Sequence, residues 1–221
     1  MGEGVPVRRI DIALRWLAVI LAVWALAETA IHLVTPCFSV NDTTLSIARR
    51  FLVQPKQHND FEYLAAQPIW HGQKLKTLLE HVELAGYNRE LINWQLDEKI
   101  YRDYVLSPVI TGSADEQLNW RRSLWEEFYP RIRHESSPEN AAVIVVRHLR
   151  ERVTISTTSN LPQDVPGIWL RQITDEAGFQ IIHVAALRSV GVSACLDSNS
   201  HAEFWDGNKW QAAPQPSVLS W

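Results

Sequence analysis

The sequence predicts an α+β fold, in which helices precede a small antiparallel sheet that packs on one central helix. Residues 176–190 form an apolar helical run, and Gly191 follows where a helix commonly ends. The chain then runs extended through 192–196 and 201–205, with Asp-Ser-Asn-Ser between them. That pattern predicts a β-hairpin packed against the helix.

Composition places the chain among ordinary globular proteins. Its 221 residues are enough for one domain with an appendage. Of these residues, 46% are hydrophobic and 21% are charged, as is usual for globular proteins. A net charge of −4 gives no basic field, so no nucleic-acid partner is expected. Ten tryptophans predict a core rich in aromatic rings, with a surface that binds carbohydrate or peptide as the alternative. Phosphate-loop, Cys-x-x-Cys and nucleophile-elbow motifs are absent, and no cofactor or metal is predicted.

The first segment, residues 1–35, is predicted to be a signal peptide or a signal anchor. Arginines precede an apolar run from Trp16 to Ala27, which is short for a membrane span. Residues 25–27, Ala-Leu-Ala, fit the small-residue rule for signal-peptidase cleavage. Both alternatives export the remaining chain, and an uncleaved segment would also tether it to the membrane.

Two segments precede the main domain. Residues 36–73 are predicted to be a linker or irregular, with 55–60 forming a loop. Residues 74–104 are predicted to form a helical hairpin. Its first helix would end at Gly86, and Asn88 would cap the second.

Residues 105–221 are predicted to form the main domain. A long helix is expected to start at Ser113 or Asp115 and to continue through Tyr129 with one apolar stripe. Four charged residues are assigned to its solvent-exposed face, where short-range pairs would form: Arg121, Arg122, Glu126 and Glu127.

The next elements follow from local signals. Ser137-Pro-Glu predicts the start of a helix that runs to about Arg152, because a capping serine, a proline and an acid favour a first turn. A short strand at 153–156 and a polar loop at 157–166 come next. Residues 167–173 then form a short helix or an extended turn, which leads into the central helix.

The segments Ala186–Cys195 and Ala202–Trp210 resemble the core of bacterial exported transglutaminase-like domains, which have the papain-like cysteine fold. In that family a helix ending Ala-Leu-Arg-x-x-Gly-Ile-Pro-Ala-Arg precedes His-Ala-Trp-x-Glu-x-Trp and Asp-Gly-x-Trp. Residues 123–133 and 141–153 resemble helices that lie upstream in the family. The resemblance covers about residues 75–216. It implies a sheet with further strands, so the domain is either truncated at its C-terminus or borrows an edge.

The departures from the family concern its catalytic groups. The resemblance places the family's nucleophilic Cys at Glu176 and its catalytic His at Asn199. The acidic third member should closely follow Trp210, where this chain has residues 211–216, Gln-Ala-Ala-Pro-Gln-Pro. A helix N-terminus favours a thiolate, whereas a carboxylate there cannot replace the sulfur as a nucleophile. The resemblance therefore implies a pseudoenzyme.

Three functional hypotheses follow. The first is a non-catalytic module of the cell envelope, periplasmic or membrane-tethered, that binds a peptide, a glycan or an envelope protein in the former active-site cleft. The second is an active exported acyltransferase or peptidase with a rearranged site, Cys195 and His201. The third is a structural fragment without a ligand. The candidate cleft residues are Trp169, Glu176, Asn199, His201 and Trp205.

Two further features of the sequence have simple interpretations. In an exported protein Cys37 and Cys195 could form a disulfide or stay unpaired, and Cys195 is interpreted as free and buried. His183 lies two helical turns after Glu176, but no third metal ligand is evident at matching spacing. We therefore interpret His183 as a partly buried, hydrogen-bonded residue.

Overall fold

The structure is a computed structural model. The residues that it describes all lie within the compact unit Phe38–Trp221: 46, 48, 50–52, 54–70, 73–92, 94, 96–113 and 116–215. The signal-peptide or anchor prediction and Cys37 fall outside these residues. Within the described part of the chain, no helix combines the length and apolar character needed to cross a membrane.

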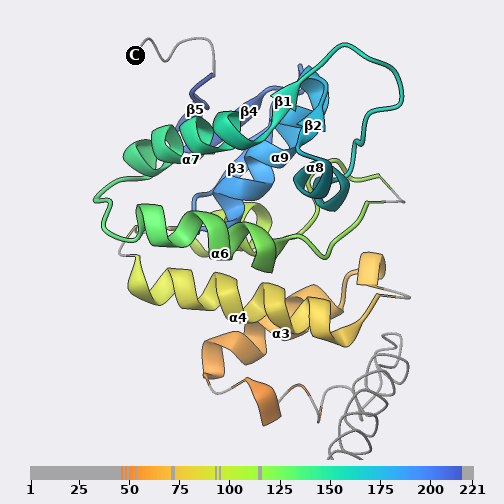
Figure 1. Cartoon of the computed structure of the whole chain (residues 1–221). Helices are drawn as coiled ribbons and strands as arrows, with labels where there is room; N and C mark the ends of the chain where they lie inside the picture. The colour runs from red at the N-terminus through yellow and green to blue at the C-terminus, as the bar shows by residue number, and fades with distance from the viewer. Residues whose placement is uncertain are drawn as a thin grey trace, which may run out of the picture. The chain divides into compact units, whose positions relative to one another are not determined.

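Helices alternate with two small sheets, which confirms the α+β class (Figure 1). The helical elements are α3 (Pro55–Ala65), η1 (Pro68–Trp70), α4 (Leu75–Leu91), α5 (Glu98–Tyr101), η2 (Arg102–Leu106), α6 (Arg121–Ile132), α7 (Pro138–Arg152), α8 (Val165–Arg171) and α9 (Glu176–Ser189). The strands are β1 (Thr154–Ile155), β2 (Ile173–Thr174), β3 (Ala194–Leu196), β4 (Ala202–Trp205) and β5 (Trp210–Ala212). Strands β1 and β2 form a parallel pair.

The central helix and its hairpin form as predicted. The Asp175 carboxylate caps α9 by accepting a hydrogen bond from the Gly178 N–H at 2.8 Å, and Gly191 turns the chain with φ of 91°. Helix α9 lies between α6 and the strands, and it contacts β3 and β4 (Figure 1). Ala202 and Phe204 are buried on the face of the sheet toward α9. Because side chains alternate along a strand, Cys195 and Glu203 lie on the opposite face.

Two of the expected N-terminal boundaries are wrong. Residues 55–60 are not a loop, because Pro55 is the first residue of α3, a position that suits its fixed φ and missing N–H. Gly86 does not end a helix either. Helix α4 continues through Gly86, where an added Cβ would lie 3.3 Å from the Gln57 side chain of α3. The glycine therefore serves the close packing of α3 on α4, and Asn88 lies inside α4 rather than at a cap.

The expected helix from Ser113 or Asp115 begins later, at Arg121, and runs past Tyr129 to Ile132. The Glu116 carboxylate explains the difference, because it closes the preceding loop. It accepts hydrogen bonds from the backbone N–H groups of Ile110 at 2.7 Å and of Thr111 and Gly112 at 3.1 Å. A side chain bound in this way stabilises a loop in place of a first helical turn.

Arg121 is buried, so its assignment to the solvent-exposed face is wrong. Its guanidinium donates to His81 Nδ1 at 2.7 Å, to the Arg188 carbonyl at 2.7 Å and to the carbonyls of Val105 and Leu106. Burial lowers the pKa of Arg121 to about 9. The carbonyls belong to the last turns of α9 and η2, whose partial negative charge offsets the cation.

The buried apolar side chains form two clusters, one in the segments up to Leu118 and one mainly in α6–α9 and the sheet, which Ile92 also joins. Hydrogen bonds between polar groups connect the segments that carry the two clusters. Asn88 on α4 donates to the Ser189 carbonyl at 2.8 Å and accepts from Trp125 Nε1 at 2.9 Å. A Cβ at Gly191 would lie 3.0 Å from the Asn88 Cβ, so α4 lies directly against the end of α9.

Candidate functional site

Glu176 occupies the first turn of α9, with its side chain exposed. Its Oε1 accepts a hydrogen bond from Gln180 Nε2 at 3.0 Å. Gln180 is only 2% exposed and reaches two other segments. Its Oε1 accepts from the Ala202 N–H at 3.0 Å, and its Nε2 donates to Gln215 Oε1 at 3.1 Å. The structure thus joins Glu176, the start of β4 and the segment that follows β5.

Asn199 is not part of this arrangement. It is exposed in the hairpin turn, where its N–H donates to Asp197 Oδ1 at 2.8 Å. Among the described residues, no hydrogen bond or ion pair is recorded between Asn199 and Glu176. The residue of β4 that is hydrogen-bonded to Gln180 of α9 is Ala202. Asn199, the position that the resemblance gives to the family's catalytic histidine, therefore lies outside the hydrogen bonds that join Glu176, Gln180 and Ala202.

The alternative nucleophile, Cys195, lies in an environment that disfavours ionisation of its thiol. Burial raises the pKa of the Cys195 thiol to about 11, against the opposing effect of Arg188. At neutral pH only about one thiol in ten thousand is then ionised. His201 is exposed and lies 3.9 Å from the Asp197 carboxylate, and no hydrogen bond from it to Cys195 is recorded in the described part of the chain. Cys195 is free, as expected, but only partly buried.

The two candidate tryptophans lie on different elements. Trp169 on α8 lies under the Arg152 guanidinium, 4.9 Å from its ring centre, and it lines a pocket of about 230 Å³ beside α6. Trp205 lies on β4, with its ring 5.5 Å from that of Trp210. Tyr104 extends this aromatic group, at 4.7 Å from Trp210. Both candidates are partly exposed, and each is held by aromatic or cationic neighbours.

A pocket of about 390 Å³ lies beside the N-terminal half of α9, and we call it the α9 cleft. Val165 and Ile181 supply apolar surface, and polar groups surround them. Gln163 Nε2 donates to Asp175 Oδ2 at 2.8 Å, which ties one wall to the cap of α9. The residues that line the α9 cleft are Thr111, Ser113, Glu116, Gln163, Asp164, Val165 and Ile181.

The walls of the α9 cleft are held by the chain's own hydrogen bonds. Glu116 binds the 110–112 loop, and Asp164 caps α8 by accepting from the Gly167 N–H at 2.8 Å. No thiol and no histidine line the pocket, whose described lining combines hydroxyl, amide and carboxylate groups with apolar side chains. Within this lining Thr111 Oγ1 donates to Glu116 Oε2 at 3.0 Å. Such a mixture of polar and apolar groups suits the binding of a ligand.

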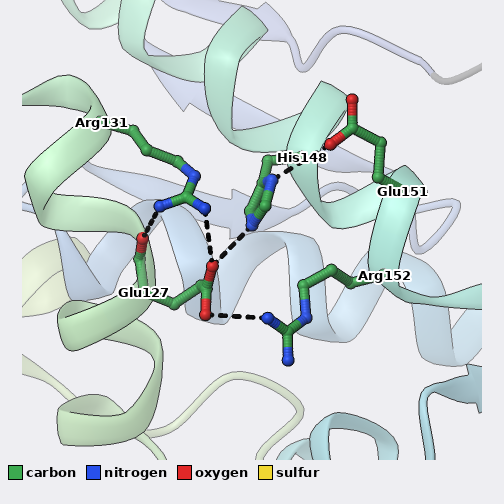
Figure 2. Close-up of polar contacts among 5 residues, drawn as sticks. All are labelled: Glu127, Arg131, His148, Glu151 and Arg152. Carbon is green, nitrogen blue, oxygen red and sulfur yellow. Dashed lines mark hydrogen bonds and ion pairs between the residues drawn. The ribbon is translucent and has the colours of Figure 1, made fainter.

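A charged cluster joins α6 to α7 (Figure 2). The Glu127 carboxylate contacts Arg131 at 3.0 Å, His148 at 2.7 Å and Arg152 at 3.0 Å. His148 also contacts Glu151 at 3.2 Å. Because Glu127 is already paired with Arg131 and with Arg152 across the two helices, we assign the cluster to helix packing rather than to ligand binding.

His183 is completely buried, and neither ring nitrogen has a hydrogen-bond partner among the described residues. The prediction of a hydrogen-bonded His183 is therefore wrong. Its ring lies 6.1 Å from that of Phe179, and burial lowers its pKa to about 4.

No group of residues suited to hold a metal ion is found within the described part of the chain.

The comparisons with known proteins add no family to these observations. Neither the protein-family models, nor the curated proteins, nor the solved structures contain a match to this chain. The functional argument therefore rests on the residues and on their geometry.

Proposed function

We propose that the chain is a non-catalytic, transglutaminase-like module of the cell envelope that binds a ligand in the α9 cleft. The observation that carries the proposal is the α9 cleft, a pocket of about 390 Å³ that the Gln163–Asp175 hydrogen bond ties to the cap of α9. The start of the same helix supports the transglutaminase-like assignment. Glu176 lies there, hydrogen-bonded to Gln180, where the resembled family has its nucleophilic sulfur. A hairpin packs against the same helix, as the papain-like arrangement requires. Peptides, glycans and envelope proteins are the ligand classes that the resemblance implies.

Binding is tested by titrating the full chain with soluble muropeptides, which carry both a sugar and a peptide, and with their separate glycan and stem-peptide parts. Ile181→Glu places a charge on the apolar surface of the α9 cleft, and we expect it to weaken binding at least about tenfold. Leu170→Glu is the matched control, because Leu170 is 84% exposed and lies outside the α9 cleft. Equal affinities for the two variants, or no binding by the wild type, would count against the proposal.

Iodoacetamide separates this function from the alternative, an active cysteine enzyme. With a pKa of about 11, Cys195 is expected to react at neutral pH more slowly than an ordinary exposed thiol. Substituting His201 with Ala should leave that rate unchanged. Adducts are mapped by mass spectrometry on the full chain. Rapid, selective labelling of Cys195 that slows in His201→Ala would favour the enzyme instead.

Glu176→Gln is expected to lower the free energy of unfolding by less than about 1 kcal/mol. The side chain is exposed, and a glutamine keeps an oxygen that can accept from Gln180. What is lost is the attraction between a negative charge and the N-terminus of α9. Urea unfolding measures the change, and a loss of several kcal/mol would show that the carboxylate has a buried partner or belongs to a charged site.

A further inference from the structure

A second pocket lies next to the α9 cleft. It has a volume of about 230 Å³ and lies between α8 and the start of α6, and we call it the α8 pocket (Figure 1). Val165 lines both pockets, so the two are neighbours. One wall passes from Glu116 in the α9 cleft to Asn119 in the α8 pocket, and the other continues from Val165 into Pro166. The same two stretches of chain therefore bound both pockets.

The α8 pocket differs from the α9 cleft in its chemistry. The walls of the α9 cleft include two carboxylates, those of Glu116 and Asp164, whereas the described lining of the α8 pocket has no charged side chain. Its polar residues are Asn119 and Ser123, which are both exposed. The rest of its lining is apolar: Trp120, Leu124, Val165, Pro166, Trp169 and Leu170. Such a lining suits an apolar group of a ligand.

Two tryptophan rings in the α8 pocket are held by their neighbours. The Trp169 ring centre lies 4.9 Å from the Arg152 guanidinium and 5.9 Å from the Phe128 ring. Trp120 is only 1% exposed, and its ring lies 5.1 Å from that of His81. The Trp120 Nε1 N–H has no hydrogen-bond acceptor among the described residues. Because an unpaired buried donor is costly, a ligand that brings a carbonyl group to this pocket offers the missing acceptor.

We propose that the α8 pocket is a second subsite, which receives a bulky apolar side chain of a peptide that also occupies the α9 cleft. This inference rests on the proposed function, because it names the class of peptide that the same surface selects. Side chains and carbonyl groups alternate along a peptide, so one residue supplies both an apolar group and an acceptor for Trp120. A glycan has no bulky apolar group to place there.

Matched peptides test the second subsite. The stem peptide of a muropeptide carries methyl groups as its only apolar side chains, so two analogues are compared with it, one with leucine in place of the first alanine and one with leucine in place of the last. Both are needed because the stem peptide can lie in the α9 cleft in either direction. Isothermal titration calorimetry of the full chain is expected to show that at least one analogue binds about tenfold more tightly than the stem peptide, since three more carbons are buried.

Ser123→Glu is expected to remove this gain, because it places a charge in the wall of the α8 pocket. The fold tolerates the change, since Ser123 is exposed in the first turn of α6, where an acidic side chain is favourable. Ser136→Glu is the matched control, because Ser136 is exposed and lines neither pocket. Leu170→Glu should act on the analogues as Ser123→Glu does, whereas muropeptides have no side chain that reaches Leu170.

The outcomes separate the second subsite from the proposed function. Tighter binding of a leucine analogue that is lost in Ser123→Glu and kept in Ser136→Glu supports the second subsite. Equal affinities of the stem peptide and both analogues overturn it, while leaving the proposed function in place. A gain that survives in Ser123→Glu overturns it as well, because the leucine then lies elsewhere. Failure of the wild type to bind the stem peptide or either analogue counts against the proposed function instead.

Discussion

Arg121→Ala is expected to lower the free energy of unfolding by about 3 kcal/mol or more, as measured by urea unfolding. The substitution leaves His81 Nδ1 and three backbone carbonyls without their donor in a buried site. It also removes the side chain that connects α4, η2 and α9. A cavity adds to the loss, because Arg121 is among the largest fully buried side chains.

Arg122→Ala provides the matched control. Arg122 is the next residue of α6, but its guanidinium is 40% exposed and pairs with Glu80 and Glu83, each at 3.1 Å. Ion pairs of this kind contribute about 1 kcal/mol or less, and salt weakens them. A similar loss in the two variants would show that Arg121 acts as an ordinary surface charge.

Acidification from pH 7 to pH 4 is expected to remove about 3 kcal/mol of stability through His183 alone. An unfolded histidine takes up a proton near its ordinary pKa of 6.5, whereas the folded protein holds that of His183 down to about 4. The unfolded state therefore binds more protons in this window. Stability is complete above pH 6.5 and falls as the pH drops toward 4. A difference of about 2.5 units at 1.36 kcal/mol each gives the magnitude.

The His183 effect is isolated by measuring urea unfolding at several pH values in parallel variants. His183→Leu is expected to make the profile between pH 6.5 and 4 less steep, because it removes one buried ring that resists protonation. Part of the slope should remain, because burial also holds the pKa of His81 well below its usual value. His134→Ala, at an exposed position after α6, is the control for removing a histidine outside the core. An unchanged slope in His183→Leu would mean that other groups carry the acid sensitivity.

Local signals explain which elements were predictable. The α9 helix, its Gly191 turn and the hairpin depend on residues close together in sequence, and so does the Ser137 cap of α7. Pro55 and Gly86 were misread because each residue type has two uses. A proline also suits the first turn of a helix, and a glycine also permits close helix packing.

The candidate site was only partly predictable, because several of its contacts join residues that lie far apart in the sequence. The position of Glu176 at the start of α9 followed from the helix pattern. The importance of Gln180 was missed, although it interrupts an apolar run one turn after Glu176, and that interruption was the available signal. The burial of Arg121 could not be foreseen, because its partners at positions 81, 105 and 188 come from distant parts of the chain.

The contact of Asn88 with the end of α9 bears on how this protein can be divided for study. A chain shortened to residues 105–221 would lose both Asn88 and His81. The Ser189 carbonyl and the Trp125 indole would then lack their partner, Asn88. The Arg121 guanidinium would lose the acceptor that His81 Nδ1 provides. The helical region before residue 105 is thus an integral support for α9, and fragments meant for binding work should retain it.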